Sequence, residues 1–251
     1  MENNKTHFGF KEVDRDQKSG LVKNIFSNVA KKYDLMNDLM SAGTHRLWKN
    51  SMIKHIDFFD NIKIIDVAGG TGDIAFRIAK NAQEKNLNYQ IEVVDINPQM
   101  LEVGRSRAVD QNLFSHLNFI EGDGEKLDFS DESFDIFTIA FGIRNFTNID
   151  KGLHEAHRVL KKGGKFICLE FSKVEDIFLQ KIYDTYSFKI IPKIGEAILK
   201  DQDSYQYLVE SIRKFPDQKS FKKLIENAGF SRVGYQNLTF GACAIHYGFK
   251  E

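Results

Sequence analysis

The chain has 251 residues, which is long enough for one α/β domain with a sizeable core. Lysine plus arginine and aspartate plus glutamate both number 35, and this balance excludes a general positive field that would recruit nucleic acid. Cys168 and Cys243 lie in apolar runs and predict reduced core residues, and no zinc-binding spacing occurs. With no signal-peptide pattern and no apolar run of about 18 residues, we expect a cytoplasmic protein.

The first sixty residues precede the regular part of the chain. Residues 1–20 are polar and predict a loose tail. Apolar residues then recur at helical spacing, which predicts several short helices over 21–62.

From residue 63 onward, strand and helix patterns alternate. The predicted strands are short, apolar and rich in β-branched residues: 63–68, 91–96, 117–122, 134–141 and 165–171. Helical patterns lie between them, at 73–84, 98–109 and 149–160. Such strands with intervening helices are typical of a parallel sheet covered on both faces. The sequence therefore predicts an α/β fold with a doubly wound, mostly parallel, Rossmann-like sheet that binds ligands beyond the carboxyl ends of its strands.

The alternation breaks after the fifth strand. Residues 172–218 are helical and rich in tyrosine and charge, and we interpret them as a lid over the substrate. A last helix over 218–229 and two strands joined by a tight turn near Phe240 and Gly241 complete the pattern. We expect a single domain with these parts: loose tail 1–20, N-terminal helices 21–62, cofactor-binding core 63–171, helical lid 172–218, and last helix with closing strands 219–251.

Acidic residues and glycines follow the first three predicted strands. Because these strand ends share one edge of a parallel sheet, their residues should meet in one pocket. The set comprises Asp66, Gly70, Thr71, Gly72, Asp73, Asp95, Asp123 and Gly124. The pattern Gly70-x-Gly72-x-x-Ala75, with Asp95 about 20 residues further on, is a variant of the dinucleotide fingerprint. Alone, it fits a nicotinamide dehydrogenase and a methyltransferase about equally.

Charge separates these two ligand classes. A nicotinamide cofactor has a pyrophosphate, which favours bare amides and a positive helix end. S-adenosylmethionine has a sulfonium and an ammonium but no phosphate, so an acid-lined pocket complements it. We therefore favour S-adenosylmethionine, with Asp66 orienting its ammonium and Asp95 accepting from its ribose hydroxyls. Asp123 and the backbone of Gly124 should lie at the adenine edge.

The chain resembles the UbiE/MenG-type quinone C-methyltransferases over nearly its whole length. The glycine loop DVAGGTGD (66–73) is generic to methyltransferases, whereas FGIRN (141–145) and SYQYLVESIR (204–213) are specific. The resemblance implies a class I methyltransferase fold and methylation of 2-polyprenyl-6-methoxy-1,4-benzoquinol or demethylmenaquinol, in ubiquinone or menaquinone biosynthesis. It also implies S-adenosylmethionine as methyl donor, no metal, and these cofactor contacts: Thr71, Asp95, Asp123 and Gly124.

The chain departs from the family pattern at Lys162, Val174, Asp128, Gly124 and Ala140, and the last two concern the cofactor site. Gly124 stands where alanine is usual, and Ala140 where some members have a serine counted among the cofactor contacts. We therefore do not assign Ala140 a side-chain contact. A degenerate domain that only binds the cofactor is disfavoured by the intact glycine loop and GIRN stretch.

Methyl transfer to an aromatic carbon requires an electron-rich ring, so the substrate should be the reduced quinol. Ionising its phenol-like group at pH 7 costs about 4 kcal/mol unless the site helps. The loop after the fourth strand provides Arg144 and Asn145, to which we assign stabilisation and orientation of the quinolate. The alternative is that Arg144 pairs with a pocket acid. The proton acceptor stays open among water, Tyr33, His154 and His246.

The resemblance implies a membrane-embedded polyprenyl quinol as substrate and other quinone-biosynthesis enzymes as partners. The neutral charge without a basic stripe predicts no nucleic acid. Residues 177–199 alternate apolar side chains with lysines, which is typical of an amphipathic lid or of a surface that meets a bilayer. We expect peripheral contact with the inner face of the membrane. The natural quinol, its prenyl length and the oligomeric state, monomer or homodimer, stay open.

Overall fold

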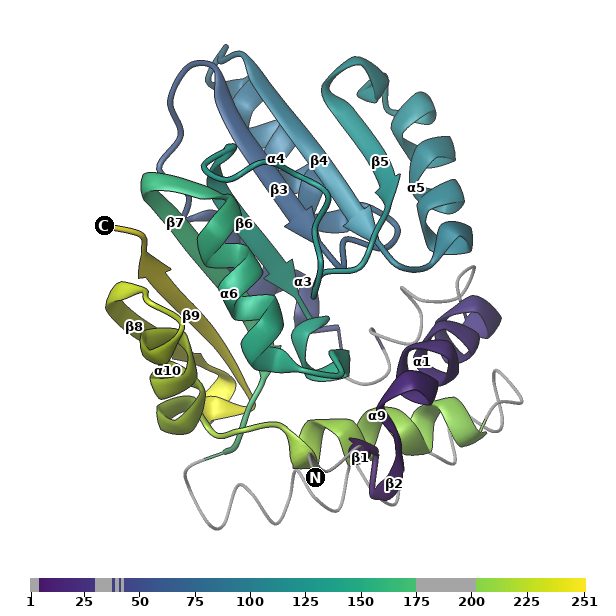
Figure 1. Cartoon of the computed structure of the whole chain (residues 1–251). Helices are drawn as coiled ribbons and strands as arrows, with labels where there is room; N and C mark the ends of the chain where they lie inside the picture. The colour runs from purple at the N-terminus through teal and green to yellow at the C-terminus, as the bar shows by residue number, and fades with distance from the viewer. Residues whose placement is uncertain (1–4, 30–37, 39–40, 42, 175–201) are drawn as a thin grey trace.

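The computed structural model describes residues 5–29, 38, 41, 43–174 and 202–251. Within them, seven strands form the central sheet: β3 (Ile62–Val67), β4 (Tyr89–Asp95), β5 (Leu117–Glu121), β6 (Phe134–Ala140), β7 (Leu160–Phe171), β8 (Ser231–Leu238) and β9 (Cys243–Phe249). Their order is β5-β4-β3-β6-β7-β9-β8 (Figure 1). Neighbours among β3 to β7 pair in parallel, whereas β9 is antiparallel to β7 and β8. The predicted doubly wound, mostly parallel sheet is confirmed.

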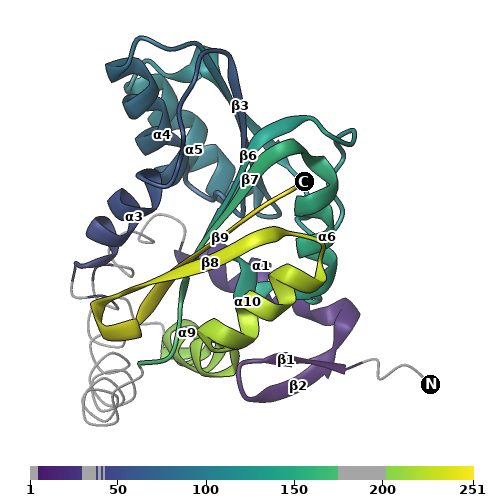
Figure 2. The ribbon, with the colours of Figure 1, turned by 90° about the vertical axis from the view of Figure 1, so that its left-hand side faces the viewer.

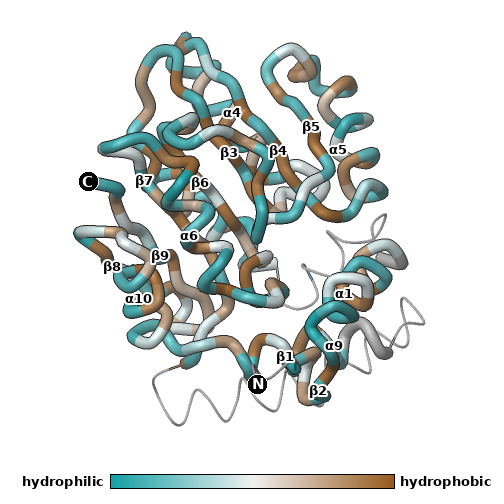
Figure 3. Tube along the Cα trace, viewed as in Figure 1, coloured by the Kyte–Doolittle hydropathy of each residue, from teal (hydrophilic) through white to brown (hydrophobic). Residues whose placement is uncertain are grey.

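Helices cover both faces of this sheet (Figure 2). The described ones that flank it are α3 (His45–Ile53), α4 (Asp73–Glu84), α5 (Pro98–Asp110), α6 (Ile149–Val159) and α10 (Gln218–Asn227). Ile64 packs in the core beneath α3 and α4, and its neighbour Ile65 packs in the core beneath α6 and α10. Because both faces are buried, the strands are continuous apolar runs, which Figure 3 shows as brown segments inside more hydrophilic helices.

The residues directly after β4 determine where the helix α5 begins. Asn97 lies outside the helix with extended backbone, and its side chain accepts from the N–H groups of Gln99 and Met100 at 3.0 and 3.2 Å. Pro98 occupies the first helical position, where its missing N–H costs nothing. The predicted helix 98–109 is therefore confirmed to within one residue.

The expected loose tail is wrong for residues 5–20. β1 (Lys5–Phe8) and β2 (Lys11–Asp14) form an antiparallel hairpin, and α1 (Arg15–Val29) begins directly after it. The hairpin lies beside α9 (Gln202–Lys214) in Figures 1 and 2. The Phe8 ring stacks on Tyr207 with centroids 4.3 Å apart, and the Phe10 N–H donates to Glu210 at 2.9 Å. These distant contacts stabilise a segment whose own sequence is polar.

The expected substrate lid is only partly described. Residues 175–201, which include the amphipathic stretch 177–199, lie outside the described residues. The remainder contains α9, so that part of the helical prediction is confirmed. The closing strands are also confirmed as β8 and β9, joined by the short helix η5 (Thr239–Gly241).

Candidate active site

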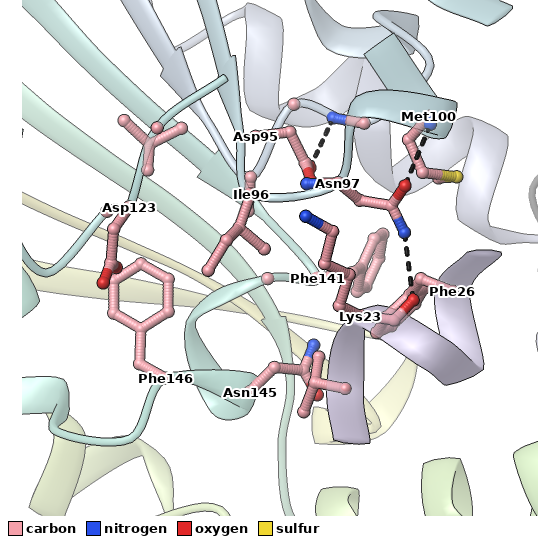
Figure 4. Close-up of a pocket in the computed structure, with 18 of the residues that line it drawn as sticks. Lys23, Phe26, Asp95, Ile96, Asn97, Met100, Asp123, Phe141, Asn145 and Phe146 are labelled. Carbon is pink, nitrogen blue, oxygen red and sulfur yellow. Dashed lines mark hydrogen bonds between the residues drawn. The ribbon is translucent and has the colours of Figure 1, made fainter. Parts of the chain in front are cut away.

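A cavity of about 320 Å³ opens at the carboxyl ends of β3, β4, β5 and β6 (Figure 4). The sequence-predicted residues that line it are Asp66, Gly70, Thr71, Asp73, Asp95, Asp123, Gly124 and Asn145. Gly72 and Arg144 are not among the lining residues. Gly72 directly precedes α4 with φ +81°, and a Cβ there would lie 3.0 Å from Phe76. Glycine is required there by the shape of the turn, and the contact of Gly72 with the cofactor stays a prediction.

Asp95 organises the glycine loop. One carboxylate oxygen accepts the Gly70 N–H at 2.9 Å, and the other accepts the Asn97 N–H at 2.8 Å. Gly70 has φ +54°, which a residue with a side chain adopts only with strain. Burial raises the pKa of Asp95 to about 6, against the effect of the two N–H donors. Each carboxylate oxygen can accept a further hydrogen bond, so the two oxygens together could accept from two ribose hydroxyls.

Asp66 is the buried acid of the cavity. Its side chain is 1% exposed, and one oxygen accepts from the Thr138 hydroxyl at 2.8 Å. The other oxygen has no hydrogen-bond partner in the described part of the structure. Burial, reinforced by Asp73 and Asp95, raises the pKa of Asp66 to about 7. A buried carboxylate oxygen without a partner fits a cationic ligand group such as an ammonium.

Asp73 differs from the expectation that all four acids await a cationic ligand. Lys49, from α3, places its Nζ 2.7 Å from one oxygen, and Arg77 places its Nε 3.0 Å from the other. Burial opposes ionisation, but these two cations hold the pKa of Asp73 below its usual value. The acid is therefore neutralised inside the protein, and the argument from its charge is corrected.

Asp123 and Gly124 lie at the β5 end of the cavity, beside Phe146 (Figure 4). A Cβ at position 124 would lie 2.5 Å from Phe146 Cζ and 2.8 Å from Val67 Cγ1. A Cβ at Gly152 would also overlap the Phe146 ring. The two glycines thus make room for a phenylalanine that lines the cavity, which explains why alanine does not suit position 124 here.

We expect Gly124→Ala to weaken S-adenosylmethionine binding and to cost about 1–3 kcal/mol of stability, because the added methyl displaces the Phe146 ring. Calorimetric titration and thermal unfolding measure both effects. Gly20→Ala is the matched control, since nothing lies within 4 Å of a Cβ at that position. Adding Phe146→Leu should restore binding to the Gly124→Ala chain. A Gly124→Ala chain that behaves like the control would contradict this packing account.

Arg144 is a buried residue that pairs with an acid. It lies on the short helix η3 (Ile143–Asn145), and its Nη1 forms a 2.9 Å ion pair with Glu170. The two side chains are 2% and 1% exposed, and Arg144 Nε also donates to Ser211 at 3.3 Å. Arg144 does not line the cavity. Arg144 therefore pairs with an acid, as in the alternative interpretation, although that acid is Glu170 and not a cavity acid. Its direct contact with a quinolate stays a prediction.

Asn145 does line the cavity. The Tyr207 hydroxyl donates to its side-chain oxygen at 2.8 Å, and burial raises the pKa of Tyr207, which keeps that hydroxyl protonated. With its oxygen held, the amide nitrogen of Asn145 is turned toward the cavity (Figure 4). Asn145 therefore presents a hydrogen-bond donor to the cavity while Tyr207 holds its oxygen, and its role in orienting a quinolate stays a prediction.

Helix α1 forms a wall of the cavity that sequence reasoning missed. Its contributing residues are Arg15, Asp16, Ser19, Val22, Lys23 and Phe26. Asn97 ties the helix down by donating to the Lys23 carbonyl at 3.1 Å and to Ser27 Oγ at 3.0 Å. Lys18 donates to the Phe146 carbonyl at 2.7 Å on the other side. The residues of α1 carry no signal beyond helical spacing, so only the fold reveals this role.

The two histidines among the proton-acceptor candidates lie away from the cavity. His154 is exposed on α6, and His246 is buried on β9 with its Nε2 3.0 Å from the Gln218 carbonyl oxygen; neither lines the cavity. Burial lowers the pKa of His246 to about 4. Tyr33 lies outside the described residues. The described residues contain no group of three or more potential metal ligands.

The strand order, with an antiparallel strand inserted near one edge, and the pocket at the glycine loop define a class I S-adenosylmethionine-dependent methyltransferase fold. A methyltransferase structure from Thermotoga maritima matches with a TM-score of 0.62 at 20% identity, over 91% of this chain and 99% of that chain. Phosphoethanolamine N-methyltransferase 2 of Haemonchus contortus, solved with S-adenosyl-L-methionine, matches with a TM-score of 0.59 at 14% identity, over 80% and 52%.

Sequence comparison is more specific. The chain is 54% identical over 245 residues to the ubiquinone/menaquinone biosynthesis C-methyltransferase UbiE of Brucella abortus, covering 97% of this chain and 90% of the relative. It is 51% identical over 275 residues to the mitochondrial 2-methoxy-6-polyprenyl-1,4-benzoquinol methylase of Mus musculus, covering 98% and 84%. The ubiE/COQ5 methyltransferase family model matches residues 11–250. The chain belongs to the ubiE/COQ5 methyltransferase family.

Proposed function

We propose that the protein transfers a methyl group from S-adenosylmethionine to a ring carbon of a polyprenyl quinol, in ubiquinone or menaquinone biosynthesis. The observation that carries the proposal is the unpartnered oxygen of Asp66, buried beside the glycine loop in a chain of this family. An ammonium next to a sulfonium matches that oxygen, whereas a pyrophosphate does not. The names of the relatives support the 2-methoxy-6-polyprenyl-1,4-benzoquinol and demethylmenaquinol rings as acceptors.

When bound, S-adenosylmethionine supplies an electrophilic methyl group. The chain's own residues fix its position: Asp66 accepts from the ammonium, Asp95 from the ribose hydroxyls, and Asp123 with the Gly124 backbone meets the adenine edge. Thr71 belongs to the same loop and accepts from Arg107 at 3.0 Å. Holding the methyl group and the attacking carbon about 3–3.5 Å apart is the largest contribution the site can make.

The acceptor ring must be reduced, because an oxidised quinone is electron-poor and has no hydroxyl to ionise. Asn145 lines the cavity with its amide nitrogen turned inward, so it can donate to the quinol oxygen as negative charge develops there. Phe26 and Phe141 also line this space and exclude water from it.

Titration of the purified chain with S-adenosylmethionine and with NAD tests the ligand class. We expect saturable binding of S-adenosylmethionine and none of NAD, because the cavity acids repel a pyrophosphate. Binding of NAD with hydride transfer would instead support the oxidoreductase alternative. Binding of S-adenosylmethionine without turnover on any reduced quinol would support a domain that only binds the cofactor.

The proposed substrate also suggests where the protein meets a membrane. Leu47 on α3 and Phe240 in η5 are 68% and 74% exposed. The residues next to them in sequence are hydrogen-bonded: the Trp48 indole N–H donates to Thr239 Oγ1 at 2.8 Å. η5 follows β8, which runs parallel to β7, so it lies at the strand edge that holds the cavity. No helix in the described ranges could span a bilayer. We propose peripheral contact with the inner face of a membrane through this edge.

We expect Leu47→Ser with Phe240→Ser to reduce liposome flotation at least about tenfold, since each large apolar side chain contributes about 1.5–3 kcal/mol when fully buried. The matched control is Val109→Ser with Phe114→Ser, two comparably exposed side chains near the amino end of β5, at the opposite edge. Turnover on a quinol with a short tail should be unchanged in both chains. Equal flotation of the two double variants would remove this edge as the membrane contact.

A further inference from the structure

Three cations line the cavity within the part of the chain that the structure describes: Arg15, Lys23 and Lys49. Two of them are on α1, where Lys23 points toward Asp95 and Ile96 (Figure 4) and is 3.2 Å from Glu121. Lys49 differs, because it is on α3, is 3% exposed, and lies 6.0 Å from the centroid of the Phe141 ring. Lys49 is therefore a buried cation beside Phe141, which follows β6. Asp123 follows β5, at the opposite end of the cavity.

The order of the strands indicates which end of the cavity holds which part of the ligand. Asp95 ends β4 and Asp123 follows β5, so the ribose and adenine belong at the β4–β5 end. Asp66 is on β3 and Phe141 follows β6, so the amino-acid end of the ligand lies over β3 and β6. Lys49 is at this second end. This placement rests on the proposed function.

The charges at that end match an amino acid. Lys49 and Arg77 both pair with Asp73, which leaves this cluster of three residues with a net charge of +1. Asp66 provides a negative charge with an unpartnered oxygen in the same cavity. The methionine part of S-adenosylmethionine carries an α-ammonium and an α-carboxylate, and a carboxylate taken out of water without a cation is strongly disfavoured.

We propose that Lys49 binds the α-carboxylate of S-adenosylmethionine and that Asp73 acts as its positioning residue. The Lys49 ammonium has three N–H donors and gives one to Asp73 at 2.7 Å, so donors remain for a carboxylate. Arg77 supplies the second positive charge that keeps the cluster attractive to an anion. Asp66 and Lys49 together then distinguish a complete α-amino acid from an amine that lacks the carboxylate.

Decarboxylated S-adenosylmethionine, which keeps the sulfonium and the ammonium but lacks the carboxylate, tests the proposal by calorimetric titration. We expect Lys49→Met to weaken binding of S-adenosylmethionine by about 10- to 100-fold and to leave binding of the decarboxylated compound within about twofold. Lys23→Met is the matched control: it removes a cavity lysine at the nucleoside end and should change both affinities by one common factor. If Lys49→Met fails to fold, Lys49→Met with Asp73→Asn removes both buried charges and should show the same selectivity.

Equal weakening of both compounds in Lys49→Met would overturn the assignment. Unchanged binding of both, with a loss of turnover, would overturn it too and would place Lys49 at the methyl acceptor. A native chain that binds neither compound would contradict the proposed function itself. Binding of both compounds with equal affinity would overturn the role of Lys49 alone.

Discussion

Arg144→Ala is expected to lower the free energy of unfolding by about 3–5 kcal/mol, because it leaves Glu170 buried without its cation. The two side chains are 2% and 1% exposed and 2.9 Å apart, and Arg144 also holds the Phe141 carbonyl and Ser211. For a chain of this length, each kcal/mol lowers the melting temperature by about 2–4 °C. Thermal and urea unfolding at pH 7.5 measure the loss directly.

The pH dependence of this loss identifies its cause. Burial raises the pKa of Glu170, and Arg144 is the main group that opposes the rise. Without Arg144 the folded protein binds a proton at Glu170 more tightly than the unfolded chain does, so its stability increases as the pH falls toward the unfolded pKa of about 4.3. The deficit of Arg144→Ala should therefore be smaller at pH 5 than at pH 8.

Two further variants distinguish the stability contributed by the Arg144–Glu170 ion pair from that of the other Arg144 hydrogen bonds. Arg144→Leu with Glu170→Leu removes both charges and should recover much of the stability. Arg144→Lys keeps the charge without the planar fork and should recover only part. An Arg144→Ala chain with native stability and greatly reduced turnover would contradict the structural role and would support a direct contact with the substrate.

Asp66→Asn is expected to weaken S-adenosylmethionine binding by about 10- to 150-fold, the equivalent of about 1.5–3 kcal/mol for a hydrogen bond to a charged group. The substitution should also remove the pH dependence of S-adenosylmethionine affinity. The pKa of Asp66 is raised to about 7 without ligand, and an ammonium held against the carboxylate lowers it. Native affinity should therefore increase as the pH rises from 6 to 7, and binding in this range should release a proton.

Calorimetric titration in buffers of different ionisation enthalpy counts the released protons. The pH range from 6 to 7 ends below the α-amino pKa of about 8, so the ammonium of the ligand stays charged throughout. Asp95, with a pKa of about 6, also titrates in the lower part of this range, so Asp95→Asn should reduce the slope near pH 6 and keep it near pH 7. An Asp66→Asn chain with native affinity and an unchanged slope would remove Asp66 from the site.

The parts of the fold that the sequence predicts are those specified by local pattern. The predicted helix 73–84 coincides with α4, and β3 differs from its prediction by one residue at each end. A strand buried on both faces must be a continuous apolar run, and a glycine loop between strand and helix marks the boundary without any tertiary information. The cavity acids follow from the same logic, because parallel strands place their carboxyl ends at one edge.

The parts that the sequence does not predict depend on distant partners. The Phe10 N–H meets Glu210 across 200 positions, and Arg144 meets Glu170 from a neighbouring strand. Lys49 reaches Asp73 from a helix that precedes the whole sheet. Nothing in the local pattern around Arg144 or Lys49 shows whether the side chain faces a ligand or an internal acid, and only the three-dimensional arrangement distinguishes these cases.

Transfer of the labelled methyl group from S-adenosylmethionine to reduced benzoquinol and naphthoquinol precursors tests the central claim most directly. Product mass and fragmentation should show one methyl replacing one ring hydrogen, with the label on carbon, for at least one of the two reduced rings. The oxidised quinones should receive none, because they lack the electron-rich ring. Absence of transfer to both reduced rings by a chain that binds S-adenosylmethionine, or label on a quinol oxygen instead of a ring carbon, would contradict the account.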